Sequence, residues 1–237
     1  MVNKIDVLDK GYVILHDTMG DDLSVVNAAR VSYNKKKEEL DDKDVRLIKF
    51  LVRNGHTSPF RHATLQFEVY APLMIARQWW KYVTGSAHQD TFMNQWNESS
   101  RRYVTEEPVF YVPYSDEWRS KPKNSKQGSG EVVEWEIGYE ATKRLMKQVD
   151  KGMRNYEWAL SVGVCAEQAR LFLPAYGMYV RWYWTASLQA LSHFLNERLA
   201  NDAQHEIREY AQAVYNLAIK KFPISLGELC NTNTKAN

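Results

Sequence analysis

The chain contains little cysteine and no long apolar run. Cys165 and Cys230 are the two cysteines among its 237 residues, and they do not form a Cys-x-x-Cys pair. This argues against a disulfide scaffold, a zinc knuckle and a thioredoxin-like redox pair, and it favours a reducing, cytoplasmic location. No segment approaches the roughly 18 apolar residues of a membrane span, and the first residues lack the apolar core of a signal peptide. We therefore expect no association with a membrane.

A strong net charge and several cofactor motifs are also missing. The 31 Lys and Arg residues nearly balance the 29 Asp and Glu residues, which leaves a formal charge of +2. Such a chain has no overall field of the kind that marks a general nucleic-acid binder. A Gly-x-Gly-x-x-Gly sequence is absent, so no Rossmann crossover is expected to hold a dinucleotide. No His, Cys or carboxylate cluster has the spacing of a metal site, and we predict no metal.

The apolar content is sufficient for one folded unit. Hydrophobic residues make up 44% of the chain, which allows a sizeable core. We expect a single domain over residues 1–230 and a flexible tail over residues 231–237. Aromatic residues cluster at 79–82 and 179–184. Clusters of this kind are usually core, but they also line pockets for flat rings.

Apolar periodicity predicts a mixture of strands and helices. Alternation predicts strands at 5–8, 12–15, 65–69, 109–112 and 179–185. A helical period predicts helices at 23–30, 45–53, 131–160, 166–171 and 186–199, one opened by Pro72, and a last one that carries Ile207–Leu217 and stops at Pro223. Asp21-Asp22 and Asn201 with Gln204 are expected to cap the first and last helices. Residues 35–44 and 83–96 are predicted to be loops.

One short segment gathers many groups that bind anions. It is Asn97-Glu98-Ser99-Ser100-Arg101-Arg102-Tyr103, downstream of Arg77-Gln78-Trp79-Trp80-Lys81. Arginine makes forked contacts with phosphate, and serine hydroxyls donate further hydrogen bonds to the same oxygens. The pattern suits a nucleoside monophosphate, although a solvated charged turn has a similar composition.

This segment is one of a series of blocks shared with a known family. In chain order the blocks are Lys4–Gly11, Ala28–Ser32, Gly55–Phe60, Ala76–Trp79, Asn97–Tyr103, Ala169–Pro174 and Phe194–Arg198. With these blocks the chain resembles the flavin-dependent thymidylate synthases over nearly its whole length. The resemblance implies an α+β fold of the thymidylate synthase-complementing type, which is a single domain of long helices packed on a small, mostly antiparallel sheet.

The chain departs from the family signature at one place. The signature is Arg-His-Arg followed by Asn-Glu-x-Ser-x-Arg-Tyr, and Lys81-Tyr82-Val83 stands where its first three residues are expected. The loop from there to Asn97 is also longer than in typical members. Lys81 keeps a charge without the fork of arginine, and Tyr82 offers a stacking ring in place of imidazole. Arg61-His62 resembles the missing pair, but it precedes a predicted strand and we interpret it as unrelated.

The resemblance implies the reductive methylation of dUMP to dTMP. The implied carbon donor is 5,10-methylenetetrahydrofolate, the reductant is NADPH and the cofactor is FAD. Neither Cys165 nor Cys230 has a neighbouring base or cation cluster that would make it a nucleophilic thiolate. The family's other route uses an arginine, matched here by Arg198, that stabilises the N3-deprotonated uracil. A homotetramer with active sites shared between subunits is implied as well.

The matched positions give two sets of binding residues. Those implied for dUMP are Gln78, Lys81, Glu98, Ser99, Ser100, Arg101, Arg102, Arg170 and Arg198. Those implied for FAD are His56, Ser58, Lys81, Tyr82, Glu98, Ser187, Gln189 and His193. Arg198 is the residue implied to be catalytic.

Helix geometry raises a question about two of these residues. Arg198 follows His193 by five positions, which is about 140° around an ideal helix. We therefore expect one straight helix not to direct both side chains into one pocket. Either the helix loosens before Arg198, or the two side chains serve different faces of an oligomer.

Two other functions are compatible with the sequence. A flavoprotein of the same fold that adds another one-carbon group to a pyrimidine nucleotide would carry the same blocks, and the product mass separates it. An RNA-binding module that uses the aromatic and arginine-rich segments would be colourless, with a steeply salt-dependent affinity. We expect no nucleic-acid partner, and a flavin absorption band would dispose of this second alternative.

Overall fold

The computed structural model describes residues 3–82, 96–99, 107–122 and 128–231. Their centre is an antiparallel five-stranded sheet with the strand order β1-β2-β3-β5-β4. The strands are β1 (Lys4–Val7), β2 (Gly11–Met19), β3 (Thr64–Pro72), β4 (Trp96–Glu98) and β5 (Tyr179–Ser187). Helices pack on this sheet, so the predicted α+β class is confirmed.

The two faces of the sheet differ in exposure. Along β3, and in the centre of β5, buried residues alternate with half-buried or exposed ones, as expected when one face is covered. Trp182 and Trp184 point to the covered face and are at most 1% exposed. On the open face, the Glu68 carboxylate accepts a hydrogen bond from the Tyr12 hydroxyl at 2.7 Å and lies 2.9 Å from His16 Nε2. A slip of one residue would exchange the faces, which fixes the register.

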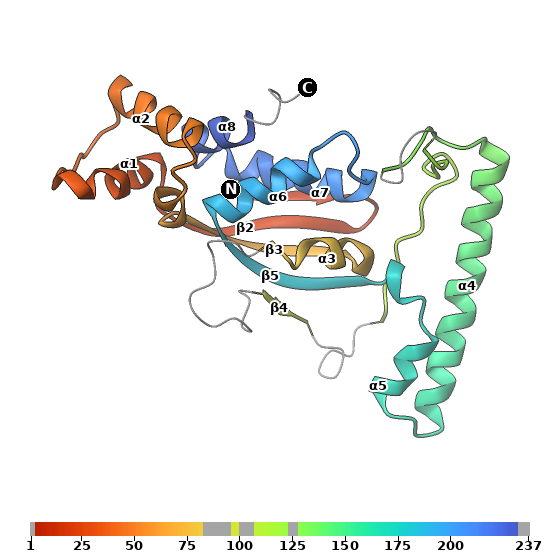
Figure 1. Ribbon diagram of the computed structural model, residues 1–237. Helices are drawn as coiled ribbons and strands as arrows, with labels where there is room; N and C mark the ends of the chain where they lie inside the picture. The colour runs from red at the N-terminus through yellow and green to blue at the C-terminus, as the bar shows by residue number, and fades with distance from the viewer. Residues whose placement is uncertain (1–2, 83–95, 100–106, 123–127, 232–237) are drawn as a thin grey trace.

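Three helices cover the buried face of the sheet (Figure 1). They are α3 (Leu73–Trp79), α6 (Leu188–Arg198) and α7 (His205–Ala218). Trp79 is fully buried, stacks on Phe194 at a ring-centroid distance of 4.3 Å, and meets Trp182 and Trp184 edge-on. Such aromatic pairs contribute about 0.5–1.5 kcal/mol beyond burial. These contacts hold α6, which carries several predicted site residues, in place against the sheet.

Another group of helices lies at one end of the sheet (Figure 1). They are α1 (Asp22–Arg30), α2 (Asp42–Arg53) and α8 (Pro223–Asn231). The Asp21 side chain caps α1, as predicted. The buried Asp22 carboxylate accepts hydrogen bonds from the backbone N–H groups of Ile224 and Ser225, each at 2.8 Å. One carboxylate therefore joins the start of α1 to the start of α8.

The charged segment before α2 is not the fully solvated loop that its composition predicts. Asp44 is completely buried, and its two carboxylate oxygens accept hydrogen bonds from Arg30 Nη2 and Lys37 Nζ, both at 2.6 Å. Burial raises the pKa of Asp44, but the bonds from the two cations outweigh it and hold the pKa below its usual value. The ion pairs thus tie residues 35–44 to α1 and α2.

Several predicted boundaries in the second half of the chain are wrong. Gln204 precedes α7 without a side-chain cap, so the Asn201–Gln204 capping box does not form. Pro223 opens α8 instead of ending the helical region, because the first residue of a helix needs no N–H partner. The predicted strand at 109–112 is replaced by an isolated bridge between Phe110 and Met178.

Helix α4 (Trp135–Ser161) stands apart from the sheet, with α5 (Ala166–Ala169) beside one of its ends (Figure 1). The sequence predicts a long amphipathic helix here, and the helix is confirmed. The described part of this chain covers its apolar stripe only in part. Val149 and Met153 pack against the core, whereas Trp135, Tyr139 and Met146 are 59%, 48% and 55% exposed. A row of large exposed apolar side chains is typical of an interaction surface.

The predicted loop over 83–96 and the predicted tail fall mostly outside the described residues. Trp96 belongs to β4 and Asn231 to α8, whereas residues 83–95 and 232–237 are not described. Among the helices of the described ranges, none combines the length and the apolar composition needed to cross a bilayer.

Candidate active site

Two of the predicted site residues on α6, His193 and Arg198, lie beside the ring of Tyr82. Tyr82 follows α3 and is 4% exposed. The guanidinium carbon of Arg198 lies 5.3 Å from the centroid of the Tyr82 ring, and the imidazole of His193 lies at the same centroid distance. The ammonium of Lys81 is 5.8 Å from it. Three residues implied for FAD and the residue implied to be catalytic therefore meet at one place.

Arg198 has an unused hydrogen-bond donor within this group. It is the last residue of α6 and is half-buried. Its Nε atom is buried without a hydrogen-bond partner in the described part of the chain. A buried guanidinium N–H without an acceptor costs free energy, on the order of 1–3 kcal/mol or more. Such a donor is suited to an anionic or carbonyl oxygen of a bound molecule.

One straight helix carries both His193 and Arg198, so the first of the two expected alternatives, a helix that loosens before Arg198, does not occur. α6 runs without interruption through Arg198, and both side chains reach the same tyrosine ring. Long side chains on a helix lean toward its N-terminus. Both side chains therefore reach a ring beside α6 although they are about 140° apart around the helix.

The N-terminal end of α6 holds a second group of predicted flavin residues. Gln189 Oε1 accepts a hydrogen bond from Arg61 Nε at 2.6 Å. Arg61 closes the short helix η2 (Ser58–Arg61), so the exposed Ser58 lies on the same element. Ser187 is different, because its buried hydroxyl caps α6 by accepting from Ala190 N at 3.1 Å. The structure thus gives Ser187 a role in starting the helix.

Arg61 is not among the site residues predicted from the sequence. It is not part of the signature, but its guanidinium lies against Gln189 and 3.3 Å from Thr57 Oγ1. Its position directly after the Gly55–Phe60 block was the available signal. His56, in the same block, is exposed, and its ring lies 5.8 Å from that of Phe50.

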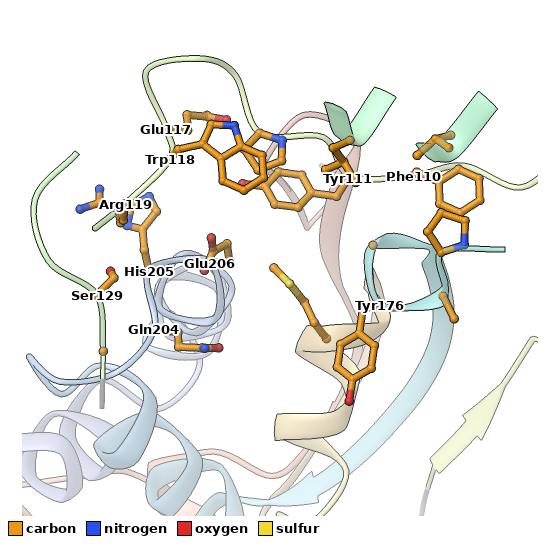
Figure 2. A pocket seen from close by; sticks show the side chains of 18 residues that line it. Phe110, Tyr111, Glu117, Trp118, Arg119, Ser129, Tyr176, Gln204, His205 and Glu206 are labelled. Carbon is orange, nitrogen blue, oxygen red and sulfur yellow. The ribbon is translucent and has the colours of Figure 1, made fainter. Parts of the chain in front are cut away.

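The predicted nucleotide residue Gln78 lies beside an aromatic cavity. Its Nε2 donates to Gln204 Oε1 at 2.5 Å. Gln204 lines a cavity of about 510 Å³, together with Met74 of α3, a volume within the usual range for small-molecule sites. Figure 2 shows side chains around this cavity that come from the 110–119 segment, the turn at Tyr176 and the start of α7.

The polar side of this cavity carries groups of both signs, Glu117 and Glu206 together with Arg119 and His205. Burial raises the pKa of Tyr111, and the carboxylates of Glu206 and Glu117 raise it further. The Tyr111 hydroxyl therefore stays protonated near neutral pH. Trp118 is fixed by a hydrogen bond from its Nε1 to Thr142 Oγ1 at 2.8 Å. None of the residues that line the cavity was predicted as a site residue.

The remaining nucleotide residues lie on separate elements. Glu98 is on β4 and Ser99 follows it, and the Ser99 backbone N–H donates to Arg181 O at 2.8 Å. Ser100, Arg101 and Arg102 lie outside the described residues. Arg170 begins the short helix η3 (Arg170–Phe172) directly after α5, and Figure 1 places α5 at the end of α4, away from α6. The described part of one chain does not bring Arg170 to Tyr82.

The described ranges also contain no group of three or more His, Cys, Asp or Glu side chains that could hold a metal ion.

The chain matches one family model over most of its length. The model is described as thymidylate synthase complementing protein and matches residues 14–224. That region contains every residue predicted for the site. The flavin-dependent thymidylate synthase of Thermus thermophilus is 39% identical over 221 residues, which are 93% of this chain and 76% of the relative. The enzyme of the same name from Thermotoga neapolitana is 37% identical over 93% of this chain and 91% of its own length.

Solved structures give the same fold. A UMP/dUMP methylase, PolB, from Streptomyces cacaoi bound with 5-Br dUMP superposes with a TM-score of 0.78 and 27% sequence identity. It covers 96% of this chain and 97% of its own. The same protein bound with 5-Br UMP gives a TM-score of 0.76 and 26% identity, with 96% of both chains covered.

Proposed function

The chain belongs to the thymidylate synthase complementing protein family, and from this premise we propose that it is a flavin-dependent thymidylate synthase. Its reaction is the reductive methylation of dUMP to dTMP with 5,10-methylenetetrahydrofolate and NADPH. The structural observation that carries the proposal is the Arg198 guanidinium, whose buried Nε has no partner among the described residues and which lies beside three predicted flavin residues. A uracil ring that has lost its N3 proton offers the anionic oxygens that such a donor needs.

Arg198 is proposed to make the uracil ring nucleophilic. Methylation requires electron density at carbon 5, and loss of the N3 proton supplies it. A guanidinium beside the ring stabilises the resulting negative charge, most strongly where water is excluded. The buried Nε and the neighbouring Tyr82 provide such a setting. The role of Arg198 is therefore to favour the ionised form of the substrate.

A cysteine nucleophile does not fit this site. Burial raises the pKa of the Cys230 thiol to about 12, so that Cys230 stays a thiol near neutral pH. Cys165 is exposed and precedes α5, which lies at the end of α4. Both cysteines are free, in agreement with the proposed reducing, cytoplasmic setting. These observations support the route through Arg198.

The residues along α6 suit a flavin. An isoalloxazine ring needs flat or aromatic neighbours and hydrogen-bond donors at its polar edge, and the FAD diphosphate needs cations. The rings of His193 and Tyr82 supply the flat neighbours, and the Lys81 ammonium supplies a hydrogen-bond donor. The Arg61 guanidinium adds a cation next to Gln189. When bound, FAD carries reducing equivalents from NADPH to the one-carbon unit. We propose that His56, Ser58, Glu98 and Ser187 complete this site, Ser187 through its control of the α6 start.

The nucleotide is proposed to contact residues from several elements. These are Gln78, Lys81, Glu98, Ser99, Ser100, Arg101, Arg102 and Arg170, in addition to Arg198. Arg170 offers the fork that holds a phosphate, and Gln78 offers an amide beside the cavity of α3 and α7.

Two measurements test the proposal: the absorption spectrum of the purified protein and the identity of its reaction product. The purified protein should show a flavin absorption band and should convert dUMP to dTMP when folate and NADPH are present. A colourless protein that binds oligonucleotides with a steep salt dependence would support the RNA-binding alternative instead. A flavoprotein that gives a product of another mass would support the transfer of a different one-carbon group.

A second substrate is favoured by one comparison. The similar Streptomyces cacaoi protein is named a UMP/dUMP methylase and has been solved with both 5-Br UMP and 5-Br dUMP. UMP is therefore a candidate substrate of this chain too. A reaction that contains both UMP and dUMP, with the amounts of the two products measured by mass spectrometry, shows which nucleotide is preferred.

We further propose a homotetramer whose active sites combine subunits. Arg170 and Tyr82 lie on different parts of the chain, which supports a site completed by a second copy. The exposed apolar stripe of α4 offers a surface for such a copy.

A monomeric form is predicted to be inactive. The double substitution Tyr139→Glu and Met146→Glu would place two charges on the α4 stripe. We expect it to give a monomer that forms little dTMP, because part of each active site would be missing. Lys147→Glu, which changes charge outside the stripe on the same helix, should keep size and activity. Analytical ultracentrifugation and product assays on the same samples measure both. Full activity from a strictly monomeric species would refute the shared site.

A further inference from the structure

Tyr82 is held in place from several directions. Its backbone N–H donates to Trp79 O at 3.0 Å, and its carbonyl accepts a hydrogen bond from Trp184 Nε1 at 3.2 Å. Its ring meets Phe194 edge-on at a centroid distance of 5.3 Å. Trp79, Trp184 and Phe194 are all completely buried. The position of the Tyr82 ring is therefore set by the rigid core between the sheet and α6.

The fixed ring faces a flexible cation. Arg198 ends α6, and its guanidinium lies 5.3 Å from the ring centroid, within the range of a cation–π contact. Burial raises the pKa of the Tyr82 hydroxyl, and the positive charge of Arg198 offsets only part of this rise, so the hydroxyl stays neutral. The ring therefore offers its face to the guanidinium and no competing charge.

We propose that Tyr82 is a positioning residue that aims Arg198 at the substrate, an inference that rests on the proposed function. With the Tyr82 ring on one side, the guanidinium keeps its buried Nε free for an oxygen of the bound uracil. An arginine side chain otherwise loses much rotamer freedom when it is immobilised. A core-anchored aromatic ring reduces that loss before the nucleotide arrives.

The alternative is that Tyr82 only fills space. Tyr82→Phe keeps the ring and removes the hydroxyl, whereas Tyr82→Leu keeps an apolar side chain and removes the π-face. Phe222→Leu is the matched control, because Phe222 is a completely buried aromatic residue directly before α8, a helix that carries neither Tyr82 nor Arg198. It reports the effect of a similar loss of volume without a change at the guanidinium.

The kinetic test compares kcat, KM for dUMP and the pH profile. We expect Tyr82→Phe to stay within a few-fold of wild type and Tyr82→Leu to lose about 100-fold in kcat, as for a misplaced catalytic group. Because a misplaced Arg198 stabilises ionised uracil poorly, the activity of Tyr82→Leu should recover at higher pH. His193, Lys81 and Glu197 also surround the Tyr82 ring, so His193→Gln, Lys81→Gln and Glu197→Gln should leave that recovery in place in the Leu background.

A structural readout separates this inference from the proposed function. Crystal structures of wild type and Tyr82→Leu should show the guanidinium moved away from its wild-type place, and calorimetry should show weaker dUMP binding, whether or not the wild type makes dTMP. If wild type is inactive but these shifts occur, the function fails and the positioning role stands. An unmoved guanidinium, or kinetic losses equal to those of Phe222→Leu with an unchanged pH profile, would overturn the positioning role.

Discussion

Arg198→Ala is expected to give a folded, yellow protein that makes dTMP about 100- to 1,000-fold more slowly than wild type. This is the usual size of the loss when one donor to a developing anion is removed. The side chain is half-buried at the end of α6 and contributes no hydrogen bond from Nε to the described part of the chain. Its removal should therefore cost activity and little stability. Product formation at saturating dUMP, together with the flavin spectrum, measures the two effects.

Two further variants sharpen this test. Arg198→Lys keeps the charge but not the planar fork, and it should fall between wild type and Arg198→Ala. Arg53→Ala removes an exposed arginine from the last turn of another helix, α2, and should keep full activity. Turnover by Arg198→Ala within a few-fold of wild type would remove the proposed role.

Asp44→Asn is expected to lower the free energy of unfolding by about 3 kcal/mol at neutral pH, because breaking a buried ion pair leaves its partners uncompensated. Arg30 and Lys37 both bond to this carboxylate, which is completely buried. An amide keeps one acceptor oxygen, places an NH2 donor where the other oxygen was, and carries no charge to balance the two cations. Urea unfolding at fixed protein concentration measures the loss as a lower midpoint with an unchanged slope.

The pH dependence of this effect has a defined sign. The pKa of Asp44 is lowered in the folded chain, so its contribution is complete above the ordinary carboxyl value of about 4 and is lost as the pH falls through the folded pKa. The difference between wild type and Asp44→Asn should therefore be constant near neutral pH and shrink in acid. Asp42→Asn, an exposed neighbour on the same helix, should change stability little. Equal midpoints for Asp44→Asn and wild type would contradict the account.

The sequence predicts those elements whose cause is local. Asp21 caps α1 through its own side chain, and Pro72 precedes α3. The strand β5 follows from its alternating tryptophans. Prediction fails where contacts with residues distant in sequence decide the environment of a side chain. The charged composition around Asp44 predicts a solvated loop, whereas its contacts in the fold bury the carboxylate. It also fails at Phe110, where the short apolar run forms a single β-bridge and not a strand. It fails again at Pro223, because proline can either follow the end of a helix or begin one.

For the candidate site, the sequence predicts residues but not how they are arranged in space. The family resemblance implies site roles for Tyr82, His193 and Arg198, and in the structure His193 and Arg198 lie beside the Tyr82 ring. Angular spacing on a helix argues against that meeting because it describes Cα positions and ignores the reach of an arginine. Arg61 is missed for the opposite reason. It lies outside the signature, and only the packing of η2 against α6 reveals its bond to Gln189.

The most direct test of the account is a mass measurement on the reaction product. Purified protein is stripped of flavin and incubated with dUMP, 5,10-methylenetetrahydrofolate and NADPH, with and without added FAD. The account predicts a product with the mass of dTMP that forms only when FAD is present. Formation of dTMP without FAD, or no dTMP from the FAD-loaded protein, would contradict it.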